Sequence, residues 1–282
     1  MIDIKNLDEL LRMALREDIG DGDHSTLACI PAEAMGKAKM VAKKAGILCG
    51  AEVGERVFHI VDPSLNVTIL KHDGDALRVG DTVMTVEGPA GSILTAERTA
   101  LNYMQRLSGI ATQTHSMVQM IEGLHTRLLD TRKTTPNMRL LEKYAVKCGG
   151  GTNHRIGLYD MIMLKDNHID FAGGIEKAID RTHEYLSKNG KELKIEIEVR
   201  DLEELERVIA HGGVDRIMLD NFDVPTLREA VKRIGGKYET EASGGITEET
   251  LRSYAETGVD FISVGALTHH IKSLDLSLVS CD

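Results

Sequence analysis

The sequence predicts an α/β protein in which a small mixed domain is followed by a barrel of parallel strands. From residue 126 onward, short apolar runs alternate with helical segments, whereas residues 36–94 are rich in strand-like runs and turns. Short strands that alternate with helices form parallel βαβ units. The chain of 282 residues is long enough for one large domain or two modest ones, and the change of pattern favours two.

The elements of the N-terminal part follow from its periodicity and its turns. Residues 1–20 are expected to form an amphipathic helix, and residues 92–123 a longer one, because their apolar residues recur every three to four positions. Between them we expect a helix at 51–62. Strand-forming stretches flank it at 37–50 and 66–89, where Asp-Gly and Gly-Asp pairs mark turns.

The rest of the chain predicts repeated strand and helix units. Strand-like runs occupy six stretches, at residues 126–131, 160–166, 193–199, 215–220, 238–243 and 259–265. Helical patterns lie among them, at residues 136–150, 173–190, 201–213, 224–236 and 247–258. Most of these helices end at glycine, which is favoured just past a helix C-terminus, and several begin at Asp, Pro or Thr.

The composition is that of a globular protein, with 42% hydrophobic and 28% charged residues. No apolar run approaches the roughly 18 residues that a membrane span needs. The first 20 residues are amphipathic and acidic, unlike a basic, apolar signal segment. We therefore expect a cytoplasmic protein with no membrane partner.

The cysteines give no recognisable pattern. Cys29, Cys49, Cys148 and Cys281 are scattered, without a CxxC pair and without histidines at zinc spacing. Neither a disulfide scaffold nor a structural zinc is expected from such spacing. We interpret all four as ordinary thiols, because free cysteine usually behaves as a small hydrophobic residue.

The charge is unevenly distributed. The net charge of -10 argues against general nucleic-acid binding. Residues 127–168, however, contain eight lysines or arginines and four acids, so this segment carries +4 and the remainder carries -14. A cationic segment in an anionic protein suits a small, strongly anionic ligand. Solvated helix faces would explain the cations at 139–147, but not Arg132, Lys133 or Lys165, which adjoin strands.

Polar residues at the predicted strand ends share one register. The first charged or small polar residue at the C-terminal end of each strand is, in order, Arg132, Lys165, Glu198, Asp220, Ser243 and Gly265. Their spacings of 33, 33, 22, 23 and 22 residues each correspond to one βα unit. The carboxyl ends of the strands in an α/β barrel meet at one rim, where active sites are built. These six positions are therefore expected to converge.

The residue types at this rim indicate its chemistry. Arginine and lysine at 132, 133, 155 and 165 suit carboxylates and phosphates. Glu198 and Asp220 suit Mg²⁺ that is completed by substrate phosphates and water, although they could instead only neutralise the cations. Small residues at 241–246 and 263–269 would let backbone N–H groups approach a phosphate. The sequence leaves open whether His154 faces the site.

These residues resemble the quinolinate phosphoribosyltransferase family. The likeness runs over essentially the whole chain and is carried by EDIGDGDHST, LTAERTALNYMQRLSGIAT, DTRKTTPNMRLLEKYAVKCGGGTNHRIGLYDMIMLKDNH, IEIEVRDLEEL, IMLDNF, EASGGI and VDFISVGALTH. DTRKT, GGGTNHR, LKDNH and SVGALTH in this order are highly specific. One departure is His270, which stands where the family is expected to have a small residue, often serine.

The resemblance implies an activity and an architecture. Quinolinate and phosphoribosyl pyrophosphate (PRPP) would react, with Mg²⁺, to nicotinate mononucleotide, pyrophosphate and CO₂ in NAD biosynthesis. The implied fold is an N-terminal α/β sandwich domain, residues 1–110, joined to an open, incomplete α/β barrel, residues 111–270, with a tail at 271–282 that can return to the first domain. The implied assembly is a homodimer with shared active sites, which can associate further into a hexamer.

The resemblance also implies roles for individual residues. Catalytic roles fall to Lys133, Lys165, Glu198 and Asp220, the two acids holding the ribose hydroxyls and metal-bound pyrophosphate and the two lysines facing phosphates or the reacting centre. The quinolinate carboxylates would contact Arg132, His154, Arg155 and Arg98 of the partner subunit. The remaining implied substrate-binding residues, most of them around the 5′-phosphate, are Thr134, Ser243, Gly244, Gly245, Val264, Gly265, Ala266 and His269.

Three alternatives stay open. A phosphoribosyltransferase for nicotinate or nicotinamide would need fewer cations for its base and generally has a longer chain. A paralogue with another substrate would be expected to change the DTRK or NHR cations, which are intact here. A non-catalytic phosphometabolite-binding barrel would be expected to lose the acidic pair, which is present.

Overall fold

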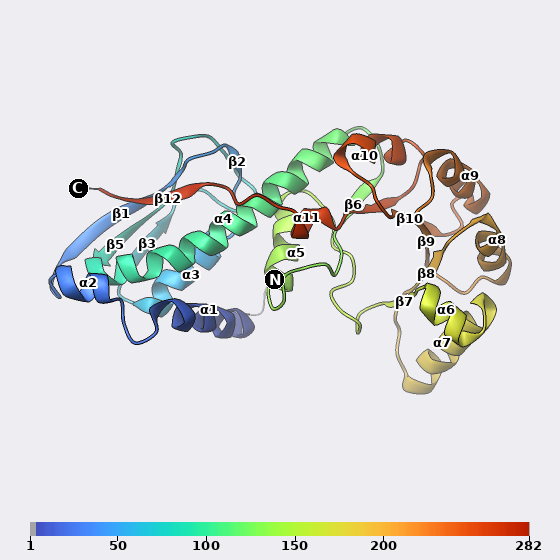
Figure 1. Ribbon diagram of the computed structural model, residues 1–282, viewed down its shortest axis with the longest axis horizontal. Helices are drawn as coiled ribbons and strands as arrows, with labels where there is room; N and C mark the ends of the chain where they lie inside the picture. The colour runs from blue at the N-terminus through green and yellow to red at the C-terminus, as the bar shows by residue number, and fades with distance from the viewer. Residues whose placement is uncertain (1–3, 282) are drawn as a thin grey trace. The chain divides into compact units, whose positions relative to one another are not determined.

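The computed structural model describes residues 4–281, which fall into two compact units (Figure 1). The N-terminal unit contains the chain up to residue 115 together with residues 134–150 and the chain from residue 267. The barrel unit contains residues 116–133 and 151–266. The predicted boundary near residue 110 falls within one long helix, α4 (Ala90–Met120). Segment 134–150 packs with the N-terminal unit although it follows the first barrel strand.

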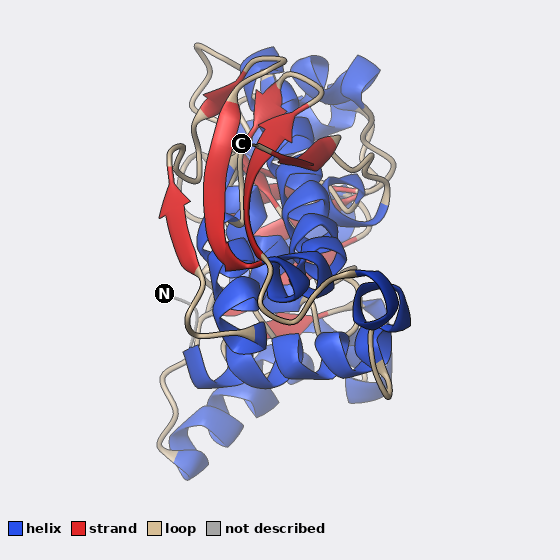
Figure 2. Ribbon diagram, turned by 90° about the vertical axis from the view of Figure 1, so that its left-hand side faces the viewer, coloured by secondary structure: helices blue, strands red, loops and turns tan. Residues whose placement is uncertain are grey.

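The N-terminal unit is built on an antiparallel sheet with strand order β12-β1-β5-β3 (Figure 2). Its strands are β1 (Met35–Ala42), β3 (Asn66–Ile69), β5 (Thr82–Pro89) and β12 (Leu276–Ser280). A two-stranded pair joins β2 (Gly46–Ile47) to β4 (Ala76–Leu77). The pairing of Met40 with Leu278 shows that the C-terminal strand returns to the N-terminal sheet.

Helices of this unit bury their apolar faces. They are α1 (Ile4–Ile19), α2 (His24–Cys29), α3 (Ala51–Val61), α4 and α5 (Arg139–Cys148). In β1 the residues Ala38, Met40 and Ala42 are buried and alternate with more exposed ones, as expected for a strand with one face in the core. Gly54 of α3 lets α4 approach closely, because a Cβ there would collide with the sulfur of Met104.

An ion pair explains why α5 belongs to the N-terminal unit. Arg106 of α4 contacts the Glu142 carboxylate at 2.7 Å, and Glu142 is fully buried. The same carboxylate accepts the backbone N–H of Thr135 at 3.1 Å. A buried carboxylate needs such partners, so this contact fixes the beginning of α5 on α4.

The barrel unit contains a six-stranded sheet in the order β6-β11-β10-β9-β8-β7, and every pairing is parallel. The strands are β6 (Arg127–Leu129), β7 (Ile162–Leu164), β8 (Ile195–Val199), β9 (Arg216–Asp220), β10 (Glu239–Ser243) and β11 (Phe261–Ser263). Because β6 and β7 are the two edges, the sheet is an open, incomplete barrel, which confirms the predicted fold class.

Helices follow the barrel strands (Figure 1). They are α6 (Asp166–Ala172), α7 (Ile175–Asn189), α8 (Leu202–His211), α9 (Val224–Ile234), α10 (Glu248–Ala255) and the short α11 (Ala266–His269). Several of them begin at a side-chain cap. Asp201 accepts the N–H groups of Glu203 and Glu204, and Asp223 accepts that of Thr226. Among the described residues, no helix is long and apolar enough to cross a membrane.

Candidate active site

The strand register places the predicted rim residues at one edge of the barrel sheet. Ser243, at the end of β10, lies beside Asp220, at the end of β9. Glu198 of β8 lies beside Met218 of β9, one pair before the strand ends. Lys165 directly follows β7. The convergence expected from the spacing therefore holds for residues that are far apart in the chain.

Glu198, Asp220 and Lys165 form an ionic group at this rim. The ammonium of Lys165 lies 3.4 Å from the Glu198 carboxylate. Burial raises the pKa of Glu198, and the charge of nearby Asp220 raises it further, while Lys165 opposes both effects. Asp220 accepts a hydrogen bond from the side chain of Asn221 at 2.6 Å. Two neighbouring carboxylates and a lysine are the donors expected where Mg²⁺ and phosphates meet.

A tight turn follows β10 at the same rim. Gly244 has a φ of +98°, and a Cβ there would collide with the side-chain oxygen of Asn221. Gly245 has a φ of +62° with open space around it. The N–H of Asn221 donates to the carbonyl of Ser243 at 2.8 Å, which ties the ends of β9 and β10 together. Asn221 was not singled out from the sequence, although its position after a strand-ending Asp was a signal.

The DTRKT segment, residues 130–134, is tied to the NHR loop, residues 149–155. The buried Asp130 carboxylate accepts the side-chain N–H of Asn153 at 2.5 Å and the backbone N–H of His154 at 2.8 Å. Leu129 also forms a bridge with Thr152. The role of Asp130 could not be predicted from the sequence, because it depends on contacts with a segment more than twenty residues away.

Arg132 and Arg155 belong to the two segments that the Asp130 carboxylate joins. Burial lowers the pKa of the Arg155 guanidinium, and the charge of Arg132 lowers it further. The Arg155 side chain also donates to the carbonyl of Met161 at 3.1 Å, which fixes its direction. Two guanidiniums held near each other against their repulsion form a site that favours a carboxylate or phosphate.

The imidazole of His154 points into the barrel interior. Its Nε2 lies 3.0 Å from Glu196 and 3.3 Å from Glu241, and both carboxylates are fully buried. Its Nδ1 accepts the backbone N–H of Arg155 at 2.6 Å. His154 therefore connects the NHR loop with a buried group that the sequence analysis did not identify.

This buried group, His154, Glu196, Arg216 and Glu241, is here called the inner ionic layer. Arg216 contacts Glu241 at 3.1 Å. Burial and the charge of Glu241 raise the pKa of Glu196 to about 7. Burial lowers the pKa of His154, but the two carboxylates outweigh it and raise that pKa to about 9. The ring, the two carboxylates and the guanidinium thus compensate one another's buried charge.

Three predicted site residues belong to the N-terminal unit. Arg98 is an exposed residue of α4. The Thr134 hydroxyl accepts a hydrogen bond from Arg139 at 3.0 Å. The ring of His269 lies 4.5 Å from that of His270, in an edge-to-face arrangement. The other predicted site residues, including Lys133, Val264, Gly265 and Ala266, lie in the barrel unit.

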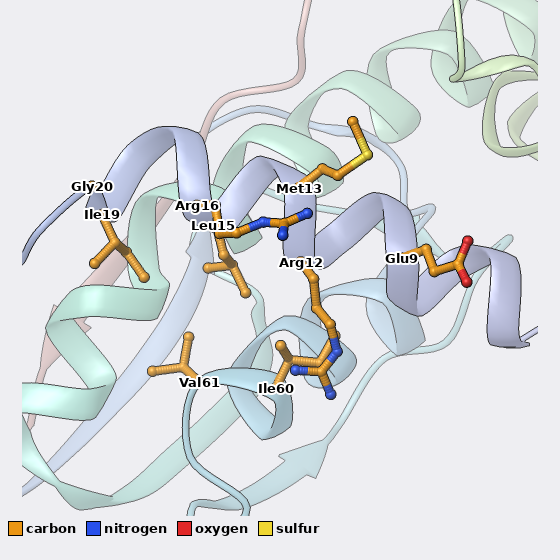
Figure 3. Close-up of a pocket in the computed structure, with 9 residues that line it drawn as sticks. All are labelled: Glu9, Arg12, Met13, Leu15, Arg16, Ile19, Gly20, Ile60 and Val61. Carbon is orange, nitrogen blue, oxygen red and sulfur yellow. The ribbon is translucent and has the colours of Figure 1, made fainter.

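A cavity of about 590 Å³ lies between α1 and α3 in the N-terminal unit. Figure 3 shows Arg12, Arg16, Met13, Ile60 and Val61 among its lining residues. None of the predicted site residues lines it. The chemistry expected from the sequence is therefore found at the barrel rim and not in this cavity.

The fold and the rim define an α/β-barrel protein whose charged side chains gather at the carboxyl ends of its strands. Residues 23–108 and 110–279 match the N-terminal and C-terminal domain models of quinolinate phosphoribosyl transferase. The chain belongs to the quinolinate phosphoribosyltransferase family, as its motifs predicted. It is accordingly a pentosyltransferase.

Individual relatives agree over nearly their full length. The chain is 44% identical to a mitochondrial decarboxylating quinolinate phosphoribosyltransferase of Nicotiana tabacum, across 97% of this chain and 82% of that protein. It is also 44% identical to a probable carboxylating nicotinate-nucleotide pyrophosphorylase of Bacillus subtilis, across 96% of this chain and 92% of that protein. The crystal structure of the Francisella tularensis nicotinate-nucleotide pyrophosphorylase matches with a TM-score of 0.94 at 41% identity, covering 100% of this chain and 98% of that one.

Proposed function

We propose that this chain transfers the phosphoribosyl group of PRPP to quinolinate and releases CO₂, giving nicotinate mononucleotide and pyrophosphate for NAD biosynthesis. One observation carries the assignment of roles. Asp130 ties the cations of the DTRKT segment to those of the NHR loop, in the unit whose rim also presents Glu198 and Asp220. This arrangement supports a site for a dicarboxylate and a site for a sugar polyphosphate in the same unit.

The cations orient quinolinate. Arg132 and Arg155 bind its carboxylates, with Arg98 of the partner subunit completing the clamp. Planar guanidiniums suit this role because they bind carboxylates through two parallel hydrogen bonds. Orientation of this kind directs the pyridine nitrogen toward C1 of the ribose and lowers the barrier by several kcal/mol, roughly, when the geometry is right.

The acids and lysines act on the sugar and its leaving group. As the C1–O bond to pyrophosphate breaks, the ribose gains positive charge, which Glu198 and Asp220 stabilise. Lys133 and Lys165 stabilise the departing pyrophosphate. Glu198 and Asp220 would hold Mg²⁺, largely through substrate phosphates and water, and the ion would supply neutralisation of phosphate charge.

The product forms in two bond changes. The pyridine nitrogen bonds to C1 as pyrophosphate leaves. The quaternised ring then accepts the electron pair of the C–C bond that breaks when the adjacent carboxylate leaves as CO₂, and that ring carbon takes up a proton. The mechanism requires no covalent bond to the enzyme.

The 5′-phosphate is assigned to the small residues of the rim. Ser243, Gly244 and Gly245 form the turn after β10, and Val264, Gly265 and Ala266 follow β11. Absence of side-chain bulk lets backbone N–H groups approach a phosphate there. Thr134 and His269 are also assigned to substrate binding, and the ring of His270 lies 4.5 Å from that of His269.

A product assay tests the reaction. Purified protein is incubated with PRPP, Mg²⁺ and either quinolinate or nicotinate, and mononucleotide and CO₂ are followed. Turnover with quinolinate alone, with CO₂ equal to mononucleotide, supports the proposal. Turnover with nicotinate alone favours the related phosphoribosyltransferase, and turnover with neither substrate favours a binding protein. Omission of Mg²⁺ with chelator present is expected to abolish turnover.

A substitution tests the quinolinate clamp. Arg155→Ala is expected to weaken quinolinate binding by about 2–3 kcal/mol and PRPP binding much less, because charge-assisted bidentate contacts are strong. Lys147→Ala is the matched control, since Lys147 is an exposed cation on α5. Equal losses for both ligands in isothermal titration would contradict the assignment of Arg155.

We also propose a homodimer with shared sites, able to form hexamers, in the cytoplasm. Arg98 is the residue that would cross between subunits. Heterodimers of Arg98→Ala and Arg155→Ala subunits are expected to regain activity, because one of their two sites is intact. Verified heterodimers without recovery would exclude sharing. Sedimentation would separate dimer from hexamer, and cell fractionation would test the compartment.

A further inference from the structure

Two cysteines and an aspartate from distant parts of the chain meet in the N-terminal unit. The Sγ atoms of Cys49 and Cys148 and a carboxylate oxygen of Asp73 all lie within 4.8 Å of one another. Cys49 is fully buried, whereas Cys148 and Asp73 are half-buried. Positions 49, 73 and 148 form no recognisable motif, which is why their spacing gave no sign of a site.

The backbone that carries the two cysteines is held by several contacts. The N–H of Cys49 donates to the Ser108 hydroxyl at 2.9 Å, and the same hydroxyl donates to the Cys49 carbonyl at 3.1 Å. Gly149, directly after Cys148, is packed so closely on α4 that a Cβ would collide with the carbonyl of Ala111. Contacts with α4 therefore hold the backbone at both cysteines.

Asp73 is oriented by two donors. One carboxylate oxygen accepts the N–H of Ala51 at 2.8 Å, and the other accepts the Tyr144 hydroxyl at 2.8 Å. Each carboxylate oxygen still has a second lone pair. Metal-binding side chains are commonly held by hydrogen bonds of this kind, which fix the ligand and leave it able to bind.

The aspartate argues for a cation instead of a disulfide. Its carboxylate shares the 4.8 Å group with both sulfurs, and a disulfide would use only the sulfurs. A divalent cation takes the carboxylate and both thiolates as ligands together.

We propose that Cys49, Asp73 and Cys148 form a binding site for a thiophilic divalent cation of the Zn²⁺ class, separate from the Mg²⁺ of the reaction. Two sulfurs and one oxygen supply three ligands, and water completes a tetrahedral site. On binding, both thiols release their protons to solvent. The cation links the end of α5 to the segment before α3, so it restrains the helix from which the NHR loop continues.

Cobalt titration tests this proposal, because Co²⁺ bound by thiolates absorbs strongly through charge transfer. Chelator-treated protein is expected to bind about one Co²⁺ per chain with a thiolate band and release of about two protons. Zn²⁺ should displace the band and Mg²⁺ should not. Cys49→Ser and Cys148→Ser are expected to abolish it, while Cys29→Ser and Cys281→Ser retain it.

Two further measurements keep the test decisive if a cysteine variant misfolds. In the unmodified protein, Zn²⁺ is expected to slow alkylation of Cys148 by iodoacetamide, followed by peptide mass spectrometry, without slowing that of exposed Cys29. Tyr144→Phe is expected to weaken cobalt binding about tenfold and to leave the band unchanged, since it removes one of the two donors that orient Asp73 and keeps both thiols. The proposal is overturned if the unmodified protein shows no thiolate band, if folded Cys49→Ser retains it, or if the two cysteines form a disulfide in reducing buffer.

Discussion

The rim and the inner ionic layer lie on the same strands but differ in the partners of their charged groups. Glu198 lies two residues after Glu196 on β8, and Asp220 lies four after Arg216 on β9. In the inner layer each charged group contacts another protein group. At the rim, the Lys165 to Glu198 contact is longer and partly exposed. Positions two to four residues apart on one strand thus separate groups that stabilise the fold from groups available to a ligand.

The largest expected effect comes from breaking the inner layer. Arg216→Met leaves the Glu241 carboxylate buried without its guanidinium partner, so the free energy of unfolding should fall by about 3–5 kcal/mol. Adding Glu241→Leu should restore much of this loss, because the uncompensated charge is removed. Urea unfolding measures both variants, and a double variant as unstable as the single one would contradict this view of the layer.

The corresponding change at the rim should affect catalysis and spare stability. Glu198→Gln is expected to lower kcat by about 10²-fold or more, because the carboxylate acts on developing charge. Its effect on unfolding should stay within about 1 kcal/mol, the range of partly exposed ion pairs. Steady-state kinetics and urea unfolding of the same preparation separate the two effects, and a loss of stability without a loss of kcat would reverse the assignment.

Adjacent glycines of the turn after β10 give a finer comparison. Gly244→Ala places a Cβ against the Asn221 side chain at a φ of +98°, so it should raise the KM for PRPP and cost about 2 kcal/mol or more of stability. Gly245→Ala has open space and a φ of +62°, and should cost about 1 kcal/mol. Equal effects on KM would show that the approach to Asn221 does not shape the site.

The smallest expected effect is a pH dependence of the inner layer. The folded-state pKa of His154 is raised to about 9 from an ordinary 6.5, so its contribution to stability is present below pH 6.5 and is lost as the pH rises through 9. Unfolding free energy should therefore fall as the pH rises over this range. Glu196→Gln, which resembles the protonated acid, should flatten the curve. If the free energy of unfolding of that variant depends on pH as before, the titrating group lies elsewhere.

Prediction from the sequence was strongest where local pattern and position in the βα unit were enough. The six strands lie where apolar runs indicated them, and the strand ends carry the expected polar residues at one edge. Asn221 and Asp130 were missed, because what makes them important is a contact with Ser243 or with the NHR loop. The roles of individual site residues stay predictions until the variants above are measured.

By itself, the sequence determined the alternation of strands and helices, the family, and the kinds of side chain at the rim. These are local properties, since the period of apolar residues and the residue type at a strand end are readable within a few positions. Only the tertiary structure decided that His154 faces Glu196 and Glu241, that β12 pairs with β1, and that Cys49, Asp73 and Cys148 meet. Such contacts depend on strand register and helix packing between distant segments, which no local pattern specifies.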